Sequence, residues 1–441
     1  MIPQIFLPIL SITLLVAAPA AAHDQIPGQV SDVPVAITGA TIHPIDRPPI
    51  SDATLLMRDG KIVDVGKNLK LPKKCKTIDG SGKHVYPGLF ESLSDLGLVE
   101  VYSVRGSIDT REVGSDNANL RPWVAVNPDS ELIPVARSNG VLVASIAAVS
   151  GNIRGLTSVI ELDGWTAQDM LIKGDAGMVV SWRGYDSRQS KDERRASERD
   201  ERLQALADHL DAASRYAKAR EADPDHTPID VRLEAVLPLI RSELPMVVRA
   251  DRRREIEAAV AFCVSRGIRP IIYGGYDAPL SAALLKQYDV PVIVHGTYRL
   301  PLRRDDPYDH PYTLPARLHE AGIRFAIGAE GSGSPGGAAQ ARNLPYHAAN
   351  AVAYGLPADE AIRAITLSPA EIMGVEDRIG SLTAGKDATL FVADGDILLT
   401  ESNVTAAFIG GAPVDLGNRH KTLANKYRTK YRIGRQTQGQ R

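Results

Sequence analysis

The sequence predicts an α/β protein that combines a distorted (β/α)8 TIM-type barrel with a small composite β-sandwich built from both chain ends. Apolar, strand-like runs alternate with helical patterns over residues 86–380, which is typical of a parallel sheet or barrel covered by helices. Short β segments and turns fill residues 33–85 and return in residues 387–415. We therefore expect these two end segments to pair in one sheet beside the barrel.

The first β segments are separated by strong turn signals. Residues 35–38, 54–57 and 62–65 have the composition of strands. Asp59 and Gly60 form the Asp-Gly pair that favours a tight hairpin between the second and third of them. The segment therefore predicts a meander rather than a helical unit.

The barrel prediction depends on six apolar runs and four helical patterns. The runs are short, continuous and bounded by polar residues, as expected for strands covered on both faces. The predicted strands are residues 141–147, 177–181, 245–248, 270–273, 291–294 and 324–327. The predicted helices are residues 253–265, 279–287, 314–321 and 357–365.

A densely charged insertion at residues 187–222 interrupts the barrel pattern. Leu203, Leu206 and Leu210 recur in it at helical spacing. A long solvated helix or hairpin is the favoured interpretation, because charges of both signs interleave. A partner-docking arm remains the alternative. Residues 416–441 follow the last β segment as a C-terminal tail.

Composition excludes several classes of function. The chain has 441 residues, with 51 Lys and Arg against 53 Asp and Glu, a net charge of -2. Such a balance provides no long-range field for nucleic acid or an anionic membrane, so we expect no nucleic-acid partner. Cys75 and Cys263 are too few for a disulfide scaffold, and two separate thiols are favoured over a disulfide.

The first residues have the pattern of an export signal. Residues 5–22 are almost wholly apolar and end in Ala20, Ala21 and Ala22. This predicts a signal peptide at residues 1–22, cleaved before His23, and a periplasmic or secreted protein. A membrane anchor is the alternative, although the run is short for a spanning helix. No later run predicts a membrane span.

Blocks at both ends of the chain resemble the opening and closing segments of the amidohydrolase superfamily, nearest to imidazolonepropionase-like members. The opening block reads ATIHPI, RDGKIVDVG and IDGSGKHVYPGL at residues 40–45, 58–66 and 78–89. The closing block reads GLP, AIRAITLSPAEIMG and GSLTAGKDA at residues 355–357, 361–374 and 380–388. The resemblance implies a hydrolase of amide, cyclic amide or related carbon–nitrogen bonds. It also implies one or two divalent ions, zinc foremost, that activate water.

The positions that match the family's metal ligands are largely replaced. Where the family has His-x-His after the first barrel strand, this chain has Leu93 and Asp95. Arg249 occupies a later histidine position, and a guanidinium repels a divalent cation. Gly274 stands at the next histidine position, and Glu330 replaces the aspartate after the last strand.

The remaining candidates define three hypotheses. In the first, Asp95, Glu330 and His295 hold one ion, and Glu330 shuttles the proton. In the second, the protein is a catalytically inert binding or partner subunit in which Arg249 pairs with Glu330. In the third, Glu330 is a general base and Arg249 stabilises an oxyanion without metal.

Three further residues are candidates for contact with a small-molecule substrate. Tyr273 lies beside the vacated histidine position at Gly274. Asp306 and His310 lie in the polar segment after the His295 strand, which in a barrel is a loop on the active face. A solvated surface loop is the alternative for this segment. The sequence also leaves open a homo- or hetero-oligomer with a related subunit.

Overall fold

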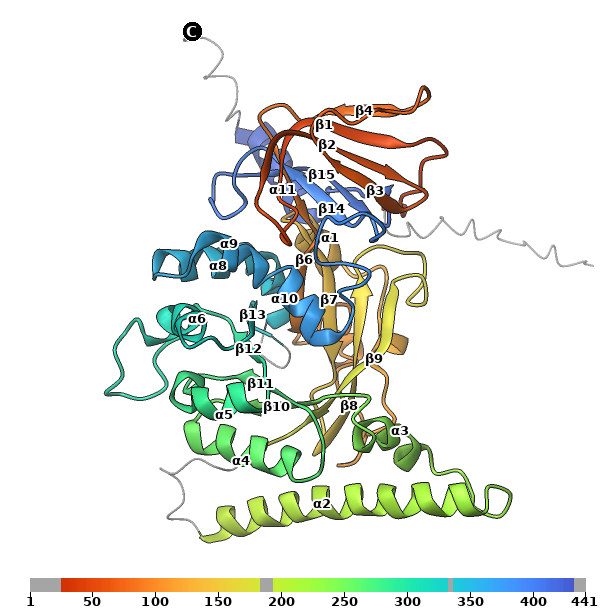
Figure 1. Cartoon of the computed structure of the whole chain (residues 1–441), viewed down its shortest axis with the longest axis vertical. Helices are drawn as coiled ribbons and strands as arrows, with labels where there is room; N and C mark the ends of the chain where they lie inside the picture. The colour runs from red at the N-terminus through yellow and green to blue at the C-terminus, as the bar shows by residue number, and fades with distance from the viewer. Residues whose placement is uncertain (1–24, 183–192, 332–335, 432–441) are drawn as a thin grey trace, which may run out of the picture.

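The computed structural model describes residues 25–182, 193–331 and 336–431 (Figure 1). The predicted signal peptide at residues 1–22 lies outside these ranges. Within them, none of the helices is both long enough and apolar enough to cross a bilayer. Cys75 and Cys263 are both free thiols, and Cys263 is buried, so the prediction of two separate thiols is confirmed.

One sheet of eight strands forms a nearly closed barrel, and the predicted fold class is confirmed. Its order is β13-β12-β11-β10-β9-β8-β7-β6. The strands are β6 (Leu89–Ser94), β7 (Val141–Ala147), β8 (Ile153–Glu161), β9 (Leu171–Val180), β10 (Met246–Ala250), β11 (Pro270–Gly274), β12 (Val292–His295) and β13 (Phe325–Gly328). All six predicted barrel strands fall on strands of this sheet.

Side chains rather than a ladder close the gap between the edge strands β6 and β13. The Ser92 hydroxyl on β6 donates to the carbonyl oxygen of Ile327 on β13 at 3.3 Å. The carboxylate of Glu91 accepts from the amide of Ala329, just beyond β13. These two polar residues satisfy backbone groups that would otherwise be buried without partners.

The barrel departs from strict strand–helix alternation at one place. β8 pairs antiparallel with both β7 and β9, so these three strands form a meander with no helix between them. The other pairs, from β9 to β13 and from β6 to β7, are parallel. The charged insertion lies in the chain between β9, the last strand of this meander, and β10.

Helices cover the parallel part of the barrel (Figure 1). The predicted helices correspond to α4, α5, α6 and α9, although α6 begins earlier than predicted, at His310. Pro311 fits its first turn, where a missing amide donor is harmless. The helices are α1 (Leu132–Arg137), α3 (Val231–Ile240), α4 (Arg253–Val264), α5 (Ala282–Gln287), α6 (His310–Glu320), α7 (Gly337–Gln340), α8 (Leu344–Ala353), α9 (Ala358–Arg363) and α10 (Leu367–Met373).

A second, mixed sheet joins the two ends of the chain. Its order is β16-β15-β14-β5-β1-β2-β3, with β4 beside β1. The central pair brings distant segments together, because Leu390 of β14 lies opposite Pro87 of β5. The strands are β1 (Val35–Ile42), β2 (Ile50–Arg58), β3 (Lys61–Gly66), β4 (Lys76–Asp79), β5 (His84–Pro87), β14 (Leu390–Ala393), β15 (Val404–Ile409) and β16 (Ala412–Pro413). The residue boundaries between the two units stay a prediction.

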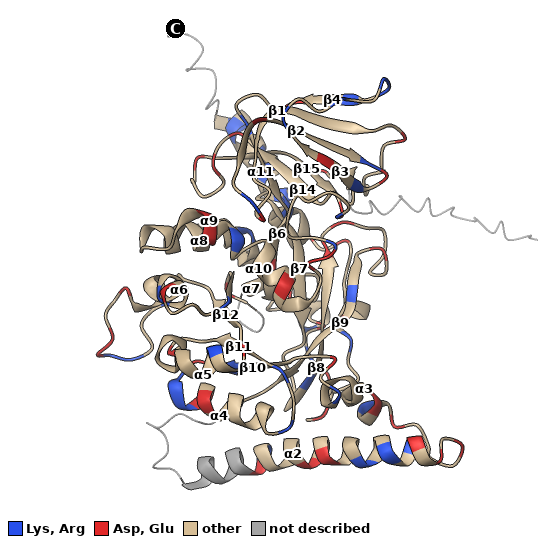
Figure 2. Ribbon diagram, viewed as in Figure 1, with Lys and Arg blue, Asp and Glu red and all other residues tan. Residues whose placement is uncertain are grey.

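From residue 193 onward, the charged insertion forms one long helix, α2 (Glu193–Ala222), at the end of the molecule opposite the mixed sheet. It packs on α3 and buries Leu206, Leu210 and Ala213 in the main core. Figure 2 shows acidic and basic residues mixed along the coloured part of this helix. The helix is therefore anchored by a leucine face, and a docking role stays a hypothesis. A second charged helix, α11 (Arg419–Tyr431), follows the last strand.

Candidate functional site

The carboxyl ends of the barrel strands bring most of the predicted site residues into one neighbourhood. Arg249 on β10 lies beside Tyr273 on β11, and His295 ends β12, beside Gly328 on β13. Two residues further along the chain is Glu330, whose main chain accepts a hydrogen bond from the His295 ring. In barrels of this type, loops and strand ends on this face carry the chemistry.

The ring of Tyr273 meets the imidazole of His295 edge to face, with centroids 5.2 Å apart. Gly331 covers this contact from the loop after β13. A Cβ atom at Gly331 would lie 1.7 Å from the Tyr273 hydroxyl and 2.7 Å from Cδ2 of His295. Its φ of +68° is also one that side chains rarely adopt. Only glycine therefore lets the loop cross here.

Two guanidinium groups, those of Arg249 and Arg299, lie near these rings. The pKa of His295 is lowered to about 3 by burial and by the nearby charges of Arg299 and Arg249. Burial raises the pKa of the Tyr273 hydroxyl; the charges of Glu91 and Asp251 add to this shift, and those of Arg249 and Arg299 oppose it. Arg299 also forms an ion pair with Asp251, at 3.5 Å. At neutral pH the strand ends thus present a neutral imidazole, a neutral phenol and fixed positive charge.

Asp95 lies near the start of α7, where a Cβ atom built at Gly337 would be 3.6 Å from its Oδ1. It is 1 % exposed, and the Tyr102 hydroxyl donates to its two oxygens at 3.4 and 3.3 Å. Tyr102 also accepts from the amide of Ala338 in α7, at 3.2 Å. Burial and the charges of Asp95 and, to a smaller extent, Glu330 raise the Tyr102 pKa to about 12. The carboxylate at 95 is therefore held by a phenol that stays protonated.

Glu91 is a buried acid that the sequence reasoning missed. The amide of Ala329 donates to both its oxygens, at 3.2 and 2.9 Å. Burial raises the pKa of Glu91 to about 8. Hydrogen bonds from the main chain of Ala329 and Leu93 oppose this shift, and the charge of Asp95 adds to it. The available signal was a carboxyl residue inside a run of otherwise apolar and small residues.

A second buried imidazole, His347 on α8, was also missed. The amide of Thr297 donates to its Nδ1 at 3.0 Å, and the Thr297 hydroxyl donates to the His347 carbonyl oxygen at 3.1 Å. Burial and the neighbouring His295 lower its pKa to about 4. His347 therefore anchors the turn after β12 and fixes the backbone that follows His295.

The donor set does not fit the divalent metal that the resemblance implies. Within the described ranges, no three His, Cys, Asp or Glu side chains are arranged to hold a metal ion, so Asp95, Glu330 and His295 do not form such a group. The Leu93 side chain has no lone pair, and Arg249 is a cation. The proposed Arg249–Glu330 ion pair is likewise not among the ion pairs of the described residues, which instead include Arg299 with Asp251.

Asp306 and His310 belong to a separate cluster. Arg303 binds Asp277 through both terminal nitrogens, at 2.8 and 2.7 Å, and binds Asp306 through Nε at 2.9 Å. The Tyr276 hydroxyl donates to Asp306 at 2.8 Å, and the Tyr276 ring stacks on His310 at 4.4 Å. These contacts hold the loop before α6 in place. The substrate-binding role stays a prediction for both residues.

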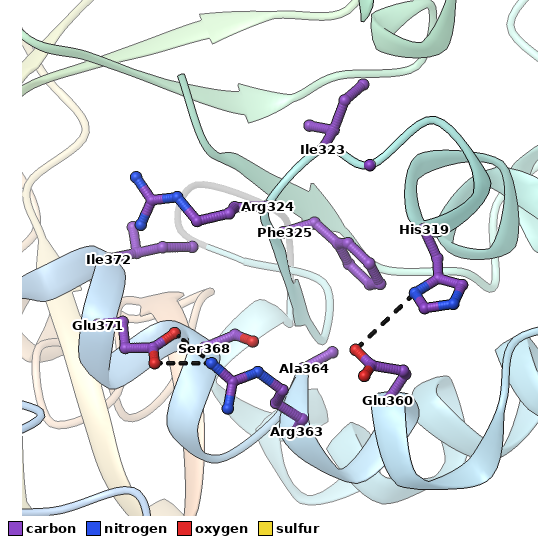
Figure 3. A pocket seen from close by; sticks show the side chains of 11 residues that line it. His319, Ile323, Arg324, Phe325, Glu360, Arg363, Ala364, Ser368, Glu371 and Ile372 are labelled. Carbon is purple, nitrogen blue, oxygen red and sulfur yellow. Dashed lines mark hydrogen bonds and ion pairs between the residues drawn. The ribbon is translucent and has the colours of Figure 1, made fainter. Parts of the chain in front are cut away.

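Cavities lie at both ends of the barrel. One of about 300 Å³ lies at the amino end of β13 (Figure 3), where Arg363 binds Glu371 at 2.6 and 2.8 Å and His319 lies 3.8 Å from Glu360. That end of a barrel generally serves stability. Another, of about 650 Å³, follows the carboxyl ends of β7 and β9 and is lined by polar residues that include Ser150, Ser181 and Arg202. Ser181 directly follows β9, whose last residue, Val180, pairs with Val248 on β10, one residue before Arg249.

Comparison with known proteins finds similarity to amidohydrolases. The model of the amidohydrolase family matches residues 310–416. An amidohydrolase, tasK, from Hapsidospora irregularis is 24% identical over 409 residues, which cover 82% of this chain and 39% of that protein. The chain thus spans about two fifths of the length of this curated relative.

Solved structures agree over most of the chain. A crystal structure of an amidohydrolase from Thermotoga maritima MSB8 has a TM-score of 0.77 at 25% identity and covers 86% of this chain and 99% of that one. Molinate hydrolase gives a TM-score of 0.53 at 15% identity and covers 89% and 96% of the two chains. The second likeness concerns the fold alone.

Proposed function

Because the chain belongs to the amidohydrolase superfamily, we propose that it hydrolyses a carbon–nitrogen bond of a small molecule with protein side chains in place of a metal centre. The observation that carries this proposal is the position of Arg249 and Arg299 near Tyr273 and His295, where their charge lowers the pKa of the imidazole. The substrate class is an amide or cyclic amide, as the superfamily implies.

Hydrolysis without a metal needs positive charge where the carbonyl oxygen becomes an oxyanion. A guanidinium supplies fixed charge and several donors, and it does not lose its proton near neutral pH. Donors that are already in place lower the barrier strongly in a site that excludes water. Arg249 has this role in the proposal, and Arg299, held by Asp251, adds to the field.

The water needs a base and the leaving nitrogen needs an acid. Glu330 is half-buried and follows the strand end beside His295. It would take one proton from water as the oxygen attacks the carbonyl carbon. The same proton would pass to the nitrogen as the carbon–nitrogen bond breaks, so that one water yields a carboxylic acid and an amine. The neutral His295 and Tyr273 would shape the wall of the pocket.

The test is turnover of a panel of small amides and cyclic amides by the purified protein, with and without a chelator. Activity should survive chelation and fall by roughly 100-fold or more in Arg249→Gln, whereas Arg249→Lys should keep part of it because the charge remains. Glu330→Gln should remove the part of the pH dependence of the turnover rate that comes from the general base. Activity that disappears on chelation and returns with zinc would contradict the proposal.

A second candidate is a catalytically inert binding subunit. It is favoured by Leu93, which replaces a ligand with a buried apolar side chain, and by the lack of a three-residue metal group within the described ranges. Such a protein would bind a carboxylate-bearing small molecule through Arg249 without turning it over. Calorimetry together with the turnover assay distinguishes the two candidates. If the wild type binds a panel member, Arg249→Gln abolishes that binding, and no panel member is turned over, the protein is an inert binding subunit.

Export remains part of the proposal. It is supported by the apolar, alanine-terminated pattern of residues 1–22. Expression of the full chain followed by N-terminal sequencing of the protein in the periplasmic and membrane fractions tests it. A new N-terminus at His23 in the periplasmic fraction agrees with cleavage, and an intact N-terminus in the membrane fraction agrees with an anchor.

A further inference from the structure

The helix α11 (Arg419–Tyr431) concentrates positive charge that the whole-chain balance conceals. Its sequence is RHKTLANKYRTKY, which contains no Asp or Glu. The five strongly basic residues are Arg419, Lys421, Lys426, Arg428 and Lys430. The chain as a whole has a net charge of -2. Figure 2 shows the basic residues of α11 in blue beside the mixed sheet, far from the mixed charges of α2.

The apolar residues of α11 share one face of the helix. Leu423, Tyr427 and Tyr431 are spaced four residues apart, which places them on one stripe. They are 39%, 48% and 61% exposed, and no residue of the helix is buried. The rings of Tyr427 and Tyr431 stack along the stripe, with centroids 6.3 Å apart. The stripe is thus not covered by the sheet beside it.

The basic residues flank this stripe on both sides. At about 100° per residue, Arg419, Lys426 and Lys430 lie along one edge of the stripe, while Lys421 and Arg428 lie along the other. This is the arrangement of a helix that lies in a membrane interface, with aromatic and aliphatic side chains inserted and basic side chains at the level of the lipid phosphates. A duplex nucleic acid would pair with the cations and leave the exposed aromatic stripe in water.

We propose that α11 docks the protein on the surface of an anionic lipid membrane. Charge complementarity selects this occupant, because α11 has five Lys and Arg and no acid, and phosphodiester headgroups supply the opposite charge. The helix would lie on the bilayer without crossing it. The docking would place the mixed-sheet end of the molecule at the membrane and leave α2 directed away from it (Figure 1).

The experiment is sedimentation of the full chain with vesicles of phosphatidylcholine and phosphatidylglycerol, and with vesicles of phosphatidylcholine alone. Binding should occur only with the anionic vesicles and should fall as salt is raised. The variant Lys426→Glu/Lys430→Glu should bind at least about 25-fold more weakly, because each removed charge accounts for about five-fold. Tyr427→Ser/Tyr431→Ser should weaken binding while leaving the charge unchanged.

The matched control reverses two exposed cations on α2, in Arg215→Glu/Lys218→Glu, which changes the net charge by the same amount. Vesicle binding should be kept in this control. An equal loss of vesicle binding in both double variants would indicate a response to net charge and would overturn the proposal. Absence of vesicle binding by the wild type would show that α11 is not a membrane site and would overturn it too. Binding to double-stranded DNA or to an acidic protein that requires α11, without vesicle binding, overturns it as well.

Discussion

Tyr273 and His295 stand edge to face at the ends of adjacent strands, with ring centroids 5.2 Å apart, and Gly331 closes over both. The contact occupies the place where the superfamily resemblance leads one to expect metal ligands. Burial and two nearby guanidinium groups hold the pKa of His295 at about 3. These strand ends therefore combine a buried imidazole and a buried phenol with two nearby guanidinium groups.

Replacement of Gly331 by alanine should destabilise the protein by about 2–4 kcal/mol, the sum of a left-handed backbone conformation and an overpacked contact. The measurement is the free energy of unfolding by denaturant. Gly336→Ala is the control, since its φ is also positive, at +81°, but no atom of the described residues lies within 4 Å of the added Cβ. That change should cost only about 1–2 kcal/mol.

A double variant checks the cause of the Gly331 effect. In Gly331→Ala/Tyr273→Phe, the hydroxyl that would lie 1.7 Å from the new Cβ is gone. Part of the lost stability should return, although Cζ at 2.9 Å still crowds the site. If the destabilisation of the double variant equals the sum of the two single effects, the clash with Tyr273 does not explain the destabilisation by Gly331→Ala.

Glu91 should make stability depend on pH. Its pKa is raised from 4.5 in the unfolded chain to about 8 in the fold, so the folded state binds the extra proton. The stabilisation is fully present below about pH 4.5 and is lost as the pH rises through about 8. The total change is on the order of 3–5 kcal/mol.

The difference between wild type and Glu91→Gln from about pH 6.5 to 8 isolates the Glu91 effect, because buried histidines such as His295 and His347, which gain protons on unfolding, contribute equally to both proteins. Glu91→Gln should flatten the decline. The exposed Glu131 provides the control, in which Glu131→Gln should leave the slope unchanged. A slope that is the same in wild type and Glu91→Gln would show that another group is responsible.

The Arg303–Asp277 pair should show a large coupling energy. Both terminal nitrogens of Arg303 reach the carboxylate, and Asp277 is buried. A double-mutant cycle with Arg303→Gln and Asp277→Asn should give roughly 1–3 kcal/mol. The exposed pair Arg253–Glu257, four residues apart on α4, is the comparison and should give about 0.3–0.5 kcal/mol. Equal coupling in both cycles would contradict the structural role given to Arg303.

Zinc should neither bind the wild-type protein stoichiometrically nor raise its Tm. The reason is that the candidate donors Asp95, Glu330 and His295 do not form a three-ligand group among the described residues. Elemental analysis after dialysis against zinc, together with thermal unfolding, checks this. The variant Leu93→His/Arg249→His restores imidazoles at two positions and should gain zinc. If the wild type binds zinc stoichiometrically and Asp95→Ala removes that zinc, the proposal of a metal-free site is wrong.

Much of the fold could be predicted because local patterns carry it. Continuous apolar runs mark strands that are covered on both faces, so β7 was predicted with its observed bounds. Strand direction is a different matter. The run that includes β9 looks the same whether its neighbour is parallel or antiparallel, and the β7–β8–β9 meander was therefore missed.

The candidate site was predictable only in part. Alignment of short blocks identified Asp95, Arg249 and Glu330 as positions on one face of the barrel, since strand ends follow from the chain order. It could not show that Asp306 is bound by Arg303 and Tyr276, because those contacts join a loop to another strand end. Glu91 and His347 were missed for the same reason: their pKa shifts come from burial by distant segments.

The sequence by itself determined the barrel, the sheet from both ends and the loss of the usual ligand types, because periodicity and residue chemistry are local. Only the tertiary structure decided what replaced the ligands. The field at His295 depends on how Arg249 and Arg299 are placed across neighbouring elements, and the exposure of α11 depends on what the sheet leaves uncovered. Distance and burial set these energies, and neither can be read along a chain.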